Sequence, residues 1–428
     1  MQYAKESTHQ PDWYKLDNVA KMYSATTTRN WNSVFRVHMT LGFDIQPELL
    51  SAAVKDICPR FPTFFVQLRK GFFWYFFETA NDSDIVQPET EYPCRPIRIA
   101  EGVKPLFRVL YYKSRISLEV FHSVTDGTGA FEFLKTLVCR YLELCGYDVS
   151  AAYESGILNF RDMPTDTETE DSFAKYYTKT KGKSEKKPNA FRFKSRKSMD
   201  ENYLRVISGT FSVEDLKKIS RQKGATITQY LTALYILSFG NCTCPRTAKP
   251  VTIFVPANLR KTFPSSTLRN FSLFTQASAA VNPDTTLDEV LTTIIPQFSD
   301  GLEKDKLLEK ISANVGIEKN FAVRIVPLFI KNFLISIINS LAERKLTSSF
   351  SNIGVVTLPD VLSKHVKKVG FMFGGSTEKG LGIGMTASSY QDKITVTFSS
   401  QYPNASVQSF FFSYLAKQGI SVEVETNV

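Results

Sequence analysis

The stretch Phe121-His122-Ser123-Val124-Thr125-Asp126-Gly127-Thr128-Gly129 organises the whole chain. Before it, residues 107–121 are rich in β-branched and aromatic side chains, which predicts a buried strand. After it, apolar residues recur three and four positions apart from Phe131 to Leu142, which predicts a helix. His122 therefore lies where a strand ends and the chain turns into a helix. Positions of this kind commonly hold reactive side chains on a rigid scaffold.

The residue types around the histidine suit such a turn. Gly127 and Gly129 allow close approach of the backbone at little steric cost, and Asp126 or Thr128 can cap the helix that follows. A histidine, with an ordinary pKa of about 6.5, can take up and return a proton near neutral pH. His122 is therefore a candidate general base. A core histidine at a strand end would show the same local pattern, so that alternative stays open.

The pattern His122-x-x-x-Asp126-Gly127, with a strand before it and a helix after it, resembles the coenzyme A-dependent acyltransferase superfamily. This group includes chloramphenicol acetyltransferase, the plant acyltransferases, the condensation domains of peptide synthetases and the bacterial alcohol acetyltransferases. The resemblance implies an α/β fold of mixed sheets, in which two chloramphenicol acetyltransferase-like domains share an active-site channel at their junction. It also implies that His122 removes a proton from the acceptor and then returns one toward the departing coenzyme A sulfur.

In this superfamily the aspartate of the motif is mainly structural. The resemblance thus implies that Asp126 turns away from the pocket toward an arginine, which the sequence does not name. The alternative is that Asp126 orients the imidazole of His122, as in a catalytic triad.

Asn258 and Arg260 stand in a second segment that resembles these acyltransferases. They follow a short predicted strand, residues 251–255, in Pro256-Ala257-Asn258-Leu259-Arg260. Two roles stay open for this pair: to hold a loop between the two halves of the chain, or to face the pantetheine or a phosphate of coenzyme A.

A third resembling segment is Ser349-Phe350-Ser351-Asn352-Ile353-Gly354. The resemblance makes it a strand that borders the active-site channel. We expect Ser351 to donate to the tetrahedral oxyanion together with backbone N–H groups, and Asn352 to contact coenzyme A. A bulged strand with a glycine is the alternative.

Departures from the superfamily narrow the expected function. The Asp-Phe-Gly-Trp-Gly segment of the plant branch is absent, and Phe121 replaces the first of two adjacent histidines in condensation domains. No Gly-x-Ser-x-Gly nucleophile elbow is present, which favours direct transfer in a ternary complex over an acyl-enzyme. We therefore expect transfer of an acyl group, in the first place acetyl, to a small alcohol or amine. The co-substrate would be acyl-coenzyme A, as in the stand-alone bacterial alcohol acetyltransferases.

Two further hypotheses remain beside this one. The donor is an acyl or peptidyl carrier protein in the first, and the chain is an inactive binding module of the same fold in the second. The intact His122, Asp126 and Gly127 count against the second hypothesis.

Length and composition predict two cores. The chain has 428 residues, of which 43% are hydrophobic, so two domains of about 200 residues each are expected. We expect an N-terminal half at 1–160 with the histidine motif, a charged linker at 161–200 and a C-terminal half at 201–428.

Charge is concentrated in the predicted linker. Residues 162–171 carry five acidic side chains, and residues 175–197 carry ten Lys or Arg against Glu185 alone. The net charge of +10 is therefore local rather than spread over the chain. A solvated tether and an electrostatic guide for the phosphates of coenzyme A are both compatible with this pattern. Nucleic acid is a poorer fit, because no recognition motif accompanies the charge.

The sequence also predicts where the protein works. Residues 1–10 are polar and show no secretory signal. Ile325 to Ala342 is interrupted by Lys331 and contains Pro327, so we expect a buried helix and no membrane span. The six cysteines have no metal-ligand spacing and there are only four histidines, so free thiols in a reducing cytoplasm and no metal site are expected.

Periodicity predicts the remaining elements, while residues 13–27 have mixed periodicity and stay unassigned. Strands are expected at 34–43, 64–68, 72–77, 106–112, 116–121, 204–211, 251–255, 271–281, 369–373, 382–390 and 393–399. Helices are expected at 46–58, from about 131 to 145, from Ser212 as N-cap, and at 228–238, 287–298, 318–341 and 407–417. The aromatic residues at 72–77 predict a strand buried on both faces, in a hairpin around Lys70-Gly71.

Overall fold

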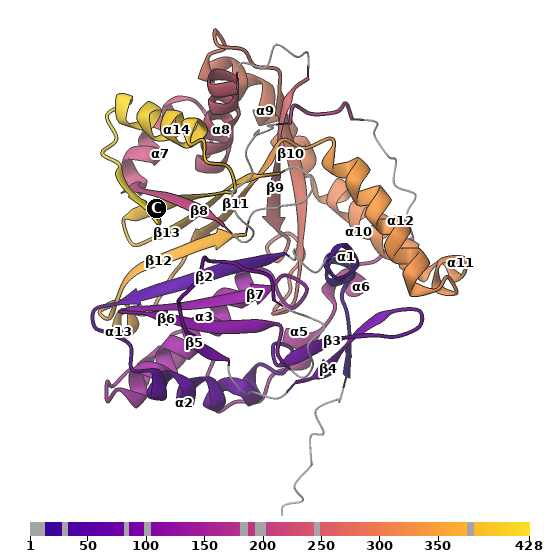
Figure 1. Cartoon of the computed structure of the whole chain (residues 1–428), viewed down its shortest axis with the longest axis vertical. Coiled ribbons are helices and arrows are strands. Elements are labelled where there is room, and N and C mark those ends of the chain that lie inside the picture. Colours follow the sequence, from indigo (N-terminus) through magenta and orange to yellow (C-terminus); the bar gives the residue numbers. More distant parts are fainter. Residues whose placement is uncertain are drawn as a thin grey trace, which may run out of the picture.

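Two sheets, each built mainly from one half of the chain, lie one above the other in the molecule (Figure 1). The computed structural model describes residues 13–27, 33–80, 85–97, 104–179, 187–192, 203–243, 249–374 and 381–428.

The elements of the N-terminal half are β1 (Trp13–Lys15), α1 (Asn18–Thr26), β2 (Val34–Leu41), α2 (Pro47–Ile57), η1 (Cys58–Arg60), β3 (Val66–Lys70), β4 (Tyr75–Thr79), β5 (Val86–Pro88), β6 (Phe107–Tyr112), β7 (Arg115–Phe121), α3 (Gly127–Leu144) and α4 (Ala151–Glu154). Two short helices follow, α5 (Asp166–Thr169) and α6 (Ser172–Lys175).

The elements of the C-terminal half are β8 (Arg205–Ser212), α7 (Val213–Gln222), α8 (Ile227–Thr243), β9 (Val251–Asn258), β10 (Ser272–Ala279), α9 (Leu287–Gly301), α10 (Lys304–Lys319), α11 (Phe321–Arg324), α12 (Leu328–Glu343), β11 (Ser348–Val355), α13 (Asp360–Ser363), β12 (Val366–Phe373), β13 (Ile383–Tyr390), β14 (Lys393–Ser400), α14 (Ser406–Lys417) and β15 (Glu423–Thr426).

The lower lobe in Figure 1 is built on a five-stranded sheet in the order β12-β2-β7-β6-β5. Only β5 and β6 run parallel. Helix α3 packs against β2 and β7, with α2 beside it. The apolar positions of α3 that recur every three or four residues are buried, so the helix forms because one of its faces can enter this core. A small sheet, β1-β4-β3, lies at the edge of the lobe.

The upper lobe is built on a seven-stranded sheet in the order β10-β9-β11-β13-β14-β8-β15. β11 is parallel to both of its neighbours, and the other pairs are antiparallel. Helix α8 contacts α9 and α14 and packs on β9 and β10. This lobe has its own apolar core, separate from the core around α3.

One strand crosses between the lobes. β12 comes from the C-terminal half but pairs with β2 along the edge of the five-stranded sheet. It also packs against β13 and β14 of the other sheet. The domain boundaries at residues 160 and 200 stay a prediction. A strand from the C-terminal half of the sequence, β12, belongs to the sheet of the N-terminal half.

Most of the predicted elements are confirmed. The strands at 106–112 and 116–121 are β6 and β7, and the helix after Gly127 ends at Leu144. Ser212 caps α7 by accepting a hydrogen bond from the backbone N–H of Asp215. Residues 13–27, unassigned from sequence, form β1 and α1.

The prediction for residues 72–77 is partly wrong. The hairpin exists, but its second strand begins at Tyr75, and Phe72 and Phe73 lie at the turn with 71% and 41% of their surface exposed. Aromatic density therefore did not mean burial on both faces.

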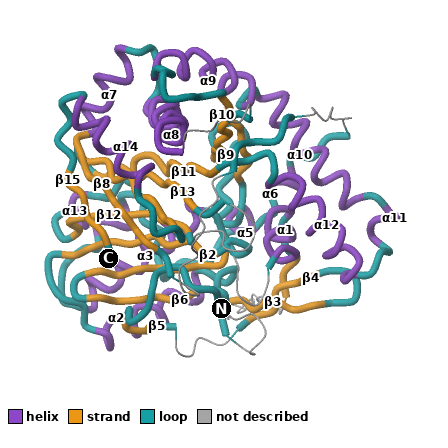
Figure 2. The backbone as a smooth tube through the Cα atoms, turned by 45° about the horizontal axis from the view of Figure 1, so that its top comes forward, coloured by secondary structure: helices purple, strands orange, loops and turns teal. Residues whose placement is uncertain are grey.

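The predictions for the longest apolar stretch were wrong in two respects. The expected helix over 318–341 is interrupted, because Pro327 precedes α12 and α11 stands apart from it. In addition, α12 is not a buried helix, since most of its apolar side chains are exposed. It lies beside α1 at the edge of the molecule (Figure 2). No helix in the described ranges is long and apolar enough to cross a membrane.

Part of the predicted linker is folded. Glu168 of α5 accepts two hydrogen bonds from the guanidinium of Arg60, at 2.8 and 2.6 Å, and this ion pair is buried. Phe173 of α6 is buried as well, so these parts of the predicted linker pack against the molecule. Six of the ten basic positions, Lys181, Lys183, Lys186, Lys194, Arg196 and Lys197, lie outside the described residues.

Candidate active site

His122 follows the last residue of β7 directly, and its backbone N–H donates to the carbonyl of Ser33 at 2.8 Å. Its imidazole contacts two aromatic rings. The ring of Tyr23, on α1, stacks on it with 4.4 Å between centroids, and the ring of Phe35, on β2, lies 4.8 Å away. Strand, helix and neighbouring strand therefore hold the imidazole in one orientation.

Asn270 determines the tautomer of His122. The side-chain oxygen of Asn270 lies 3.1 Å from Nδ1 of His122. Its amide nitrogen donates to Oδ2 of Asp17 and to the carbonyl of Ser123, both at 3.3 Å, which fixes the orientation of the amide. Because an amide oxygen can only accept, Nδ1 of His122 carries a proton. In the neutral ring, Nε2 is then the nitrogen that can accept one.

Burial lowers the pKa of His122 below its ordinary value. The negative charge of Asp126 and the hydrogen bond to Asn270 oppose this shift without reversing it. The imidazole is therefore neutral at pH 7, which is the form that a general base requires. For the carboxyl of Asp17, burial has the opposite effect and raises the pKa to about 6, although the positive charge of Arg269 opposes this rise.

The carboxylate of Asp126 accepts four hydrogen bonds, none of them from His122. Its Oδ1 accepts from the backbone N–H groups of Thr128 and Gly129, at 3.1 and 3.2 Å, and so caps α3. Its Oδ2 accepts from Nη1 of Arg260 at 2.7 Å and from the N–H of Phe271 at 2.9 Å. These contacts hold the carboxylate against α3 and Arg260, and a structural role for Asp126 stays a prediction.

Arg260 is the arginine that the sequence could not name. Its guanidinium also donates to the backbone carbonyls of Thr267 and Arg269, at 2.8 and 2.7 Å through Nη2. The amide of Asn258 accepts from the N–H of Arg260 at 3.0 Å and donates to Oγ1 of Thr128 at 3.0 Å. Both residues thus join the loop after β9 to the start of α3, which favours the loop-holding alternative. A contact of either residue with coenzyme A stays a prediction.

The glycines of the motif allow other segments to approach. A Cβ on Gly127 would lie 2.3 Å from Cδ1 of Ile353, and a Cβ on Gly129 would lie 2.2 Å from the carbonyl oxygen of Leu268. The second contact is with backbone, which cannot move aside as a side-chain end can. The glycines therefore bring β11 and the segment before β10 against the start of α3.

Ser351 and Asn352 both lie on β11, half-buried, close to Ile353. The amide of Asn352 donates to Oγ1 of Thr228 at 3.0 Å and accepts from the N–H of Gly354 at 2.9 Å, which holds the irregular end of the strand. The predicted roles of Ser351 toward an oxyanion and of Asn352 toward coenzyme A stay predictions.

Tyr23, Asn270 and Asp17 belong to the site but were not found from the sequence. Asn270 is separated from His122 by 148 positions and no motif joins them. The sequence offered only an asparagine directly before the strand predicted at 271–281. Tyr23 lies in a segment without clear periodicity.

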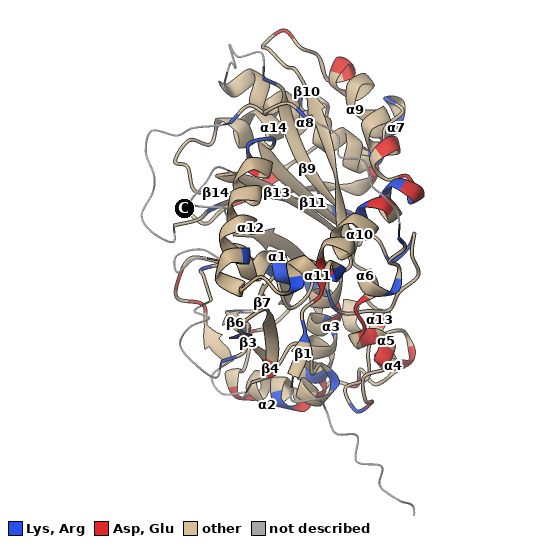
Figure 3. Cartoon of the chain, turned by 90° about the vertical axis from the view of Figure 1, so that its right-hand side faces the viewer, with Lys and Arg blue, Asp and Glu red and all other residues tan. Residues whose placement is uncertain are grey.

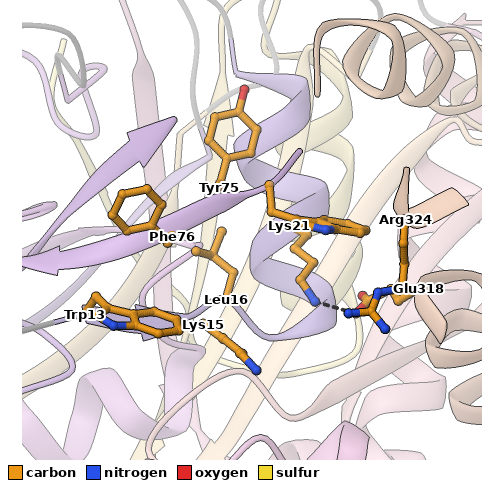
Figure 4. A pocket seen from close by; sticks show the side chains of 9 residues that line it. Trp13, Lys15, Leu16, Lys21, Tyr75, Phe76, Glu318 and Arg324 are labelled. Carbon is orange, nitrogen blue, oxygen red and sulfur yellow. Dashed lines mark hydrogen bonds and ion pairs between the residues drawn. The ribbon is translucent and has the colours of Figure 1, made fainter. Parts of the chain in front are cut away.

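A cavity of about 620 Å³ lies beside the first turns of α1 (Figure 4). Its lining is mostly apolar and aromatic, with three cations and one carboxylate. The lining residues are Trp13, Lys15, Leu16, Lys21, Trp74, Tyr75, Phe76, Glu318 and Arg324. Lys21 forms an ion pair with Glu318 across it. No sequence pattern predicted this cavity.

Comparisons with known proteins show a likeness in structure but not in sequence. No protein-family model matches the sequence, and no curated protein matches it either. The structure of F. graminearum TRI101 complexed with coenzyme A and deoxynivalenol superposes with a TM-score of 0.61, at 10% identity, over 95% of this chain and 97% of the other.

Two further structures widen the comparison. TRI3, a trichothecene 15-O-acetyltransferase from Fusarium sporotrichioides, gives a TM-score of 0.59 at 10% identity, over 95% and 94% of the two chains. The first condensation domain of the CDA synthetase gives 0.55 at 12% identity, over 94% and 93%. The chain therefore has the two-lobed, chloramphenicol acetyltransferase-like fold of these acetyltransferases and condensation domains.

Proposed function

We propose that the chain is an acyltransferase that moves an acyl group, in the first place acetyl, from coenzyme A to a small alcohol or amine. The observation that carries this proposal is the orientation of His122 by Asn270 at the meeting of the two lobes. Burial, which lowers the pKa of His122, supports the neutral form that a general base requires. The fold adds support, because a protein of the same fold has been solved with coenzyme A and a small molecule.

His122 acts as the general base in this proposal. Its Nε2 removes the proton of the acceptor hydroxyl or amine, and the acceptor atom forms a bond to the thioester carbonyl carbon. The oxyanion of the tetrahedral intermediate accepts hydrogen bonds from Ser351 and from backbone N–H groups. Collapse breaks the carbon–sulfur bond, and the proton on His122 passes to the sulfur to give free coenzyme A. No acyl-enzyme forms.

Replacing His122 by Ala tests the assignment. General-base assistance is worth about 10²–10⁴-fold in rate, so the variant should lose at least that factor. The measurement is thiol release from acyl-coenzyme A donors in the presence of pooled alcohols and amines, with circular dichroism as the control for folding. Near-normal turnover by a folded His122→Ala protein would remove His122 from the mechanism.

Ser351→Ala tests the oxyanion role separately. An oxyanion donor acts mainly in the transition state, so kcat should fall more than KM rises. A change in the donor KM alone would instead make Ser351 a residue of the binding wall.

A carrier protein as donor is the second candidate, and the likeness to a condensation domain favours it. In that case free coenzyme A thioesters would be nearly inert, and acyl groups loaded on a carrier would be transferred. The same thiol-release assay, run with both donors, separates the two functions. Turnover with neither donor, although the fold is intact, would favour an inactive binding module.

A further inference from the structure

Helix α12 presents its apolar side chains outward. Seven large apolar residues on it are exposed, among them Phe329, Phe333 and Ile338 at 72%, 66% and 65%. They form two neighbouring rows of residues four positions apart, which share one side of a helix. The rows are Phe329, Phe333, Ile337 and Leu341, and Ile330, Leu334 and Ile338. This is the reverse of an ordinary surface helix, whose apolar stripe faces the core.

The opposite side of α12 is polar and holds the helix in place. Lys331 is only 6% exposed, and its Nζ donates to the carbonyl of Phe73 at 3.0 Å and lies over the ring of Trp74. The amide of Asn332 donates to the hydroxyl of Tyr75 at 2.7 Å. Because specific polar contacts fix the inward side, the outward direction of the apolar stripe is built into the fold.

Neighbouring segments extend the stripe. The N–H of Leu328 donates to the carbonyl of Phe72, so the tip of the β3–β4 hairpin, with exposed Phe72 and Phe73, lies at the start of α12. Phe321 and Ile325, just before α12, are exposed as well. We call this set the apolar face: Phe72, Phe73, Phe321, Ile325, Phe329, Ile330, Phe333, Leu334, Ile337, Ile338 and Leu341. Large exposed apolar side chains gathered on one helix and the segments joined to it mark an interaction site.

The charges around the apolar face are mainly positive. Lys70, Lys319 and Arg324 are exposed near one end of it, and Arg344 and Lys345 follow the other end. Within the described residues none of these five pairs with a carboxylate. The nearby carboxylates are engaged, since Glu78 pairs with Arg69, Glu318 with Lys21, and Glu343 accepts from the amide of Asn339. Figure 3, which looks onto α12, shows that the helix itself is almost uncharged.

We propose that the apolar face binds the surface of a lipid bilayer that contains anionic headgroups. Helix α12 has 16 residues and a length of about 24 Å, less than the roughly 30 Å of a hydrocarbon core, so it lies in the interface instead of spanning it. An apolar stripe flanked by cations is the pattern of interfacial helices. The cations complement the charge of anionic headgroups. Helices α11 and α12 lie at the outer side of the molecule in Figure 1, where a bilayer surface can reach them.

Vesicle sedimentation tests this proposal with the full chain. We expect the protein to sediment with vesicles of phosphatidylcholine containing about 30 mol% phosphatidylglycerol, and more weakly with phosphatidylcholine alone. Phe329→Gln, Phe333→Gln and Ile338→Gln together should lower the partition coefficient by about 100-fold or more, because three large apolar side chains no longer enter the interface. Circular dichroism and gel filtration verify that the variant is folded.

A matched control replaces three exposed apolar residues elsewhere, with Tyr112→Gln, Met163→Gln and Val424→Gln. This variant should bind vesicles like the unchanged protein. Lys70→Gln, Lys319→Gln, Arg324→Gln and Lys345→Gln together should remove the preference for anionic vesicles, and added salt should do the same.

Three results would overturn the proposal. The first is that the protein sediments with neither kind of vesicle. The second is that the control variant loses vesicle binding as much as the α12 variant does. The third is that the protein binds no vesicles but forms a dimer in sedimentation velocity, which the three α12 substitutions dissociate. In the last case the apolar face would join two copies of the chain. None of these measurements depends on acyl transfer, so they stand apart from the test of the proposed function.

Discussion

Asn270 and His122 form the central pair of the candidate site at the scale of single residues. The asparagine is 1% exposed and uses both ends of its amide, so neither the amide nor the imidazole can turn without losing hydrogen bonds. A neutral amide in this place leaves the pKa of His122 low, since it adds no negative charge beside Nδ1. An aspartate there would stabilise the imidazolium form instead.

The pH dependence of His122 follows from its lowered pKa. The neutral ring should persist down to below pH 6.5, so the acidic limb of kcat/KM should lie below that value. Asn270→Asp should move the limb to higher pH, because the added carboxylate favours the protonated ring. NMR titration of the His122 ring measures the same shift without any substrate, and assignment is feasible with four histidines in the chain. An unmoved titration in Asn270→Asp would show that Asn270 does not determine the charge of the ring.

The same shift bears on stability. Between the lowered pKa in the folded state and about 6.5, the unfolded chain binds a proton that folded His122 does not. The contribution of His122 to stability is therefore present above pH 6.5 and is lost as the pH falls through the lower value.

At the scale of elements, Asp126 joins three of them. It caps α3, pairs with Arg260 after β9 and accepts from the N–H of Phe271 before β10. The motif that marks the histidine in the sequence is thus also the joint between a helix of one lobe and two strands of the other. This explains why a carboxylate stands there although it does not contact the imidazole.

Asp126→Asn should therefore destabilise the fold. The side chain of Arg260, which is only 10% exposed, would lose its charged partner, and such a loss can cost about 3–5 kcal/mol. The measurement is the free energy of unfolding in urea. Asp148→Asn is the matched control, because Asp148 is exposed and also accepts a backbone hydrogen bond two residues on, from Ser150; it should change stability by less than about 1 kcal/mol. Unchanged stability with abolished turnover would instead support an orienting role of Asp126.

At the scale of the whole molecule, neither half of the chain completes its own lobe. The five-stranded sheet takes β12 from residues 366–373, and the core around α3 includes Leu268, Val356 and Leu362. Conversely, the loop that closes around Asp126 belongs to the C-terminal half. The two lobes are therefore folded together, and the site lies where they share residues.

A fragment of residues 1–192 should consequently not fold alone. Without β12, the edge of β2 loses its ladder and the core loses Val369 and Phe371, which are buried. The measurement is cooperative urea unfolding of the purified fragment, and co-expression with residues 203–428 is the control expected to restore a soluble complex. A cooperative transition of the fragment by itself would mean that the N-terminal half is an autonomous domain.

Several features were determined by the sequence itself because they depend on near neighbours. The strand that ends at Phe121, the helix that starts at Gly127 and the cap at Ser212 all follow from residues within a few positions of one another. Periodicity reports which side of an element is apolar, and cap residues report where a helix begins. His122 could be singled out for the same reason, since its whole motif is local.

Only the tertiary structure decided which distant groups meet. Arg260 lies 134 positions from Asp126 and Asn270 lies 148 positions from His122, and no local pattern encodes such a pairing. The sequence also could not predict which side of α12 faces solvent. A periodic pattern shows that a helix has an apolar side, but it does not show which part of the protein or solvent that side contacts. In α12 the polar side contacts the protein, through hydrogen bonds to Phe73 and Tyr75. The apolar side of α12 faces outward because the polar side makes the hydrogen bonds that hold the helix on the molecule.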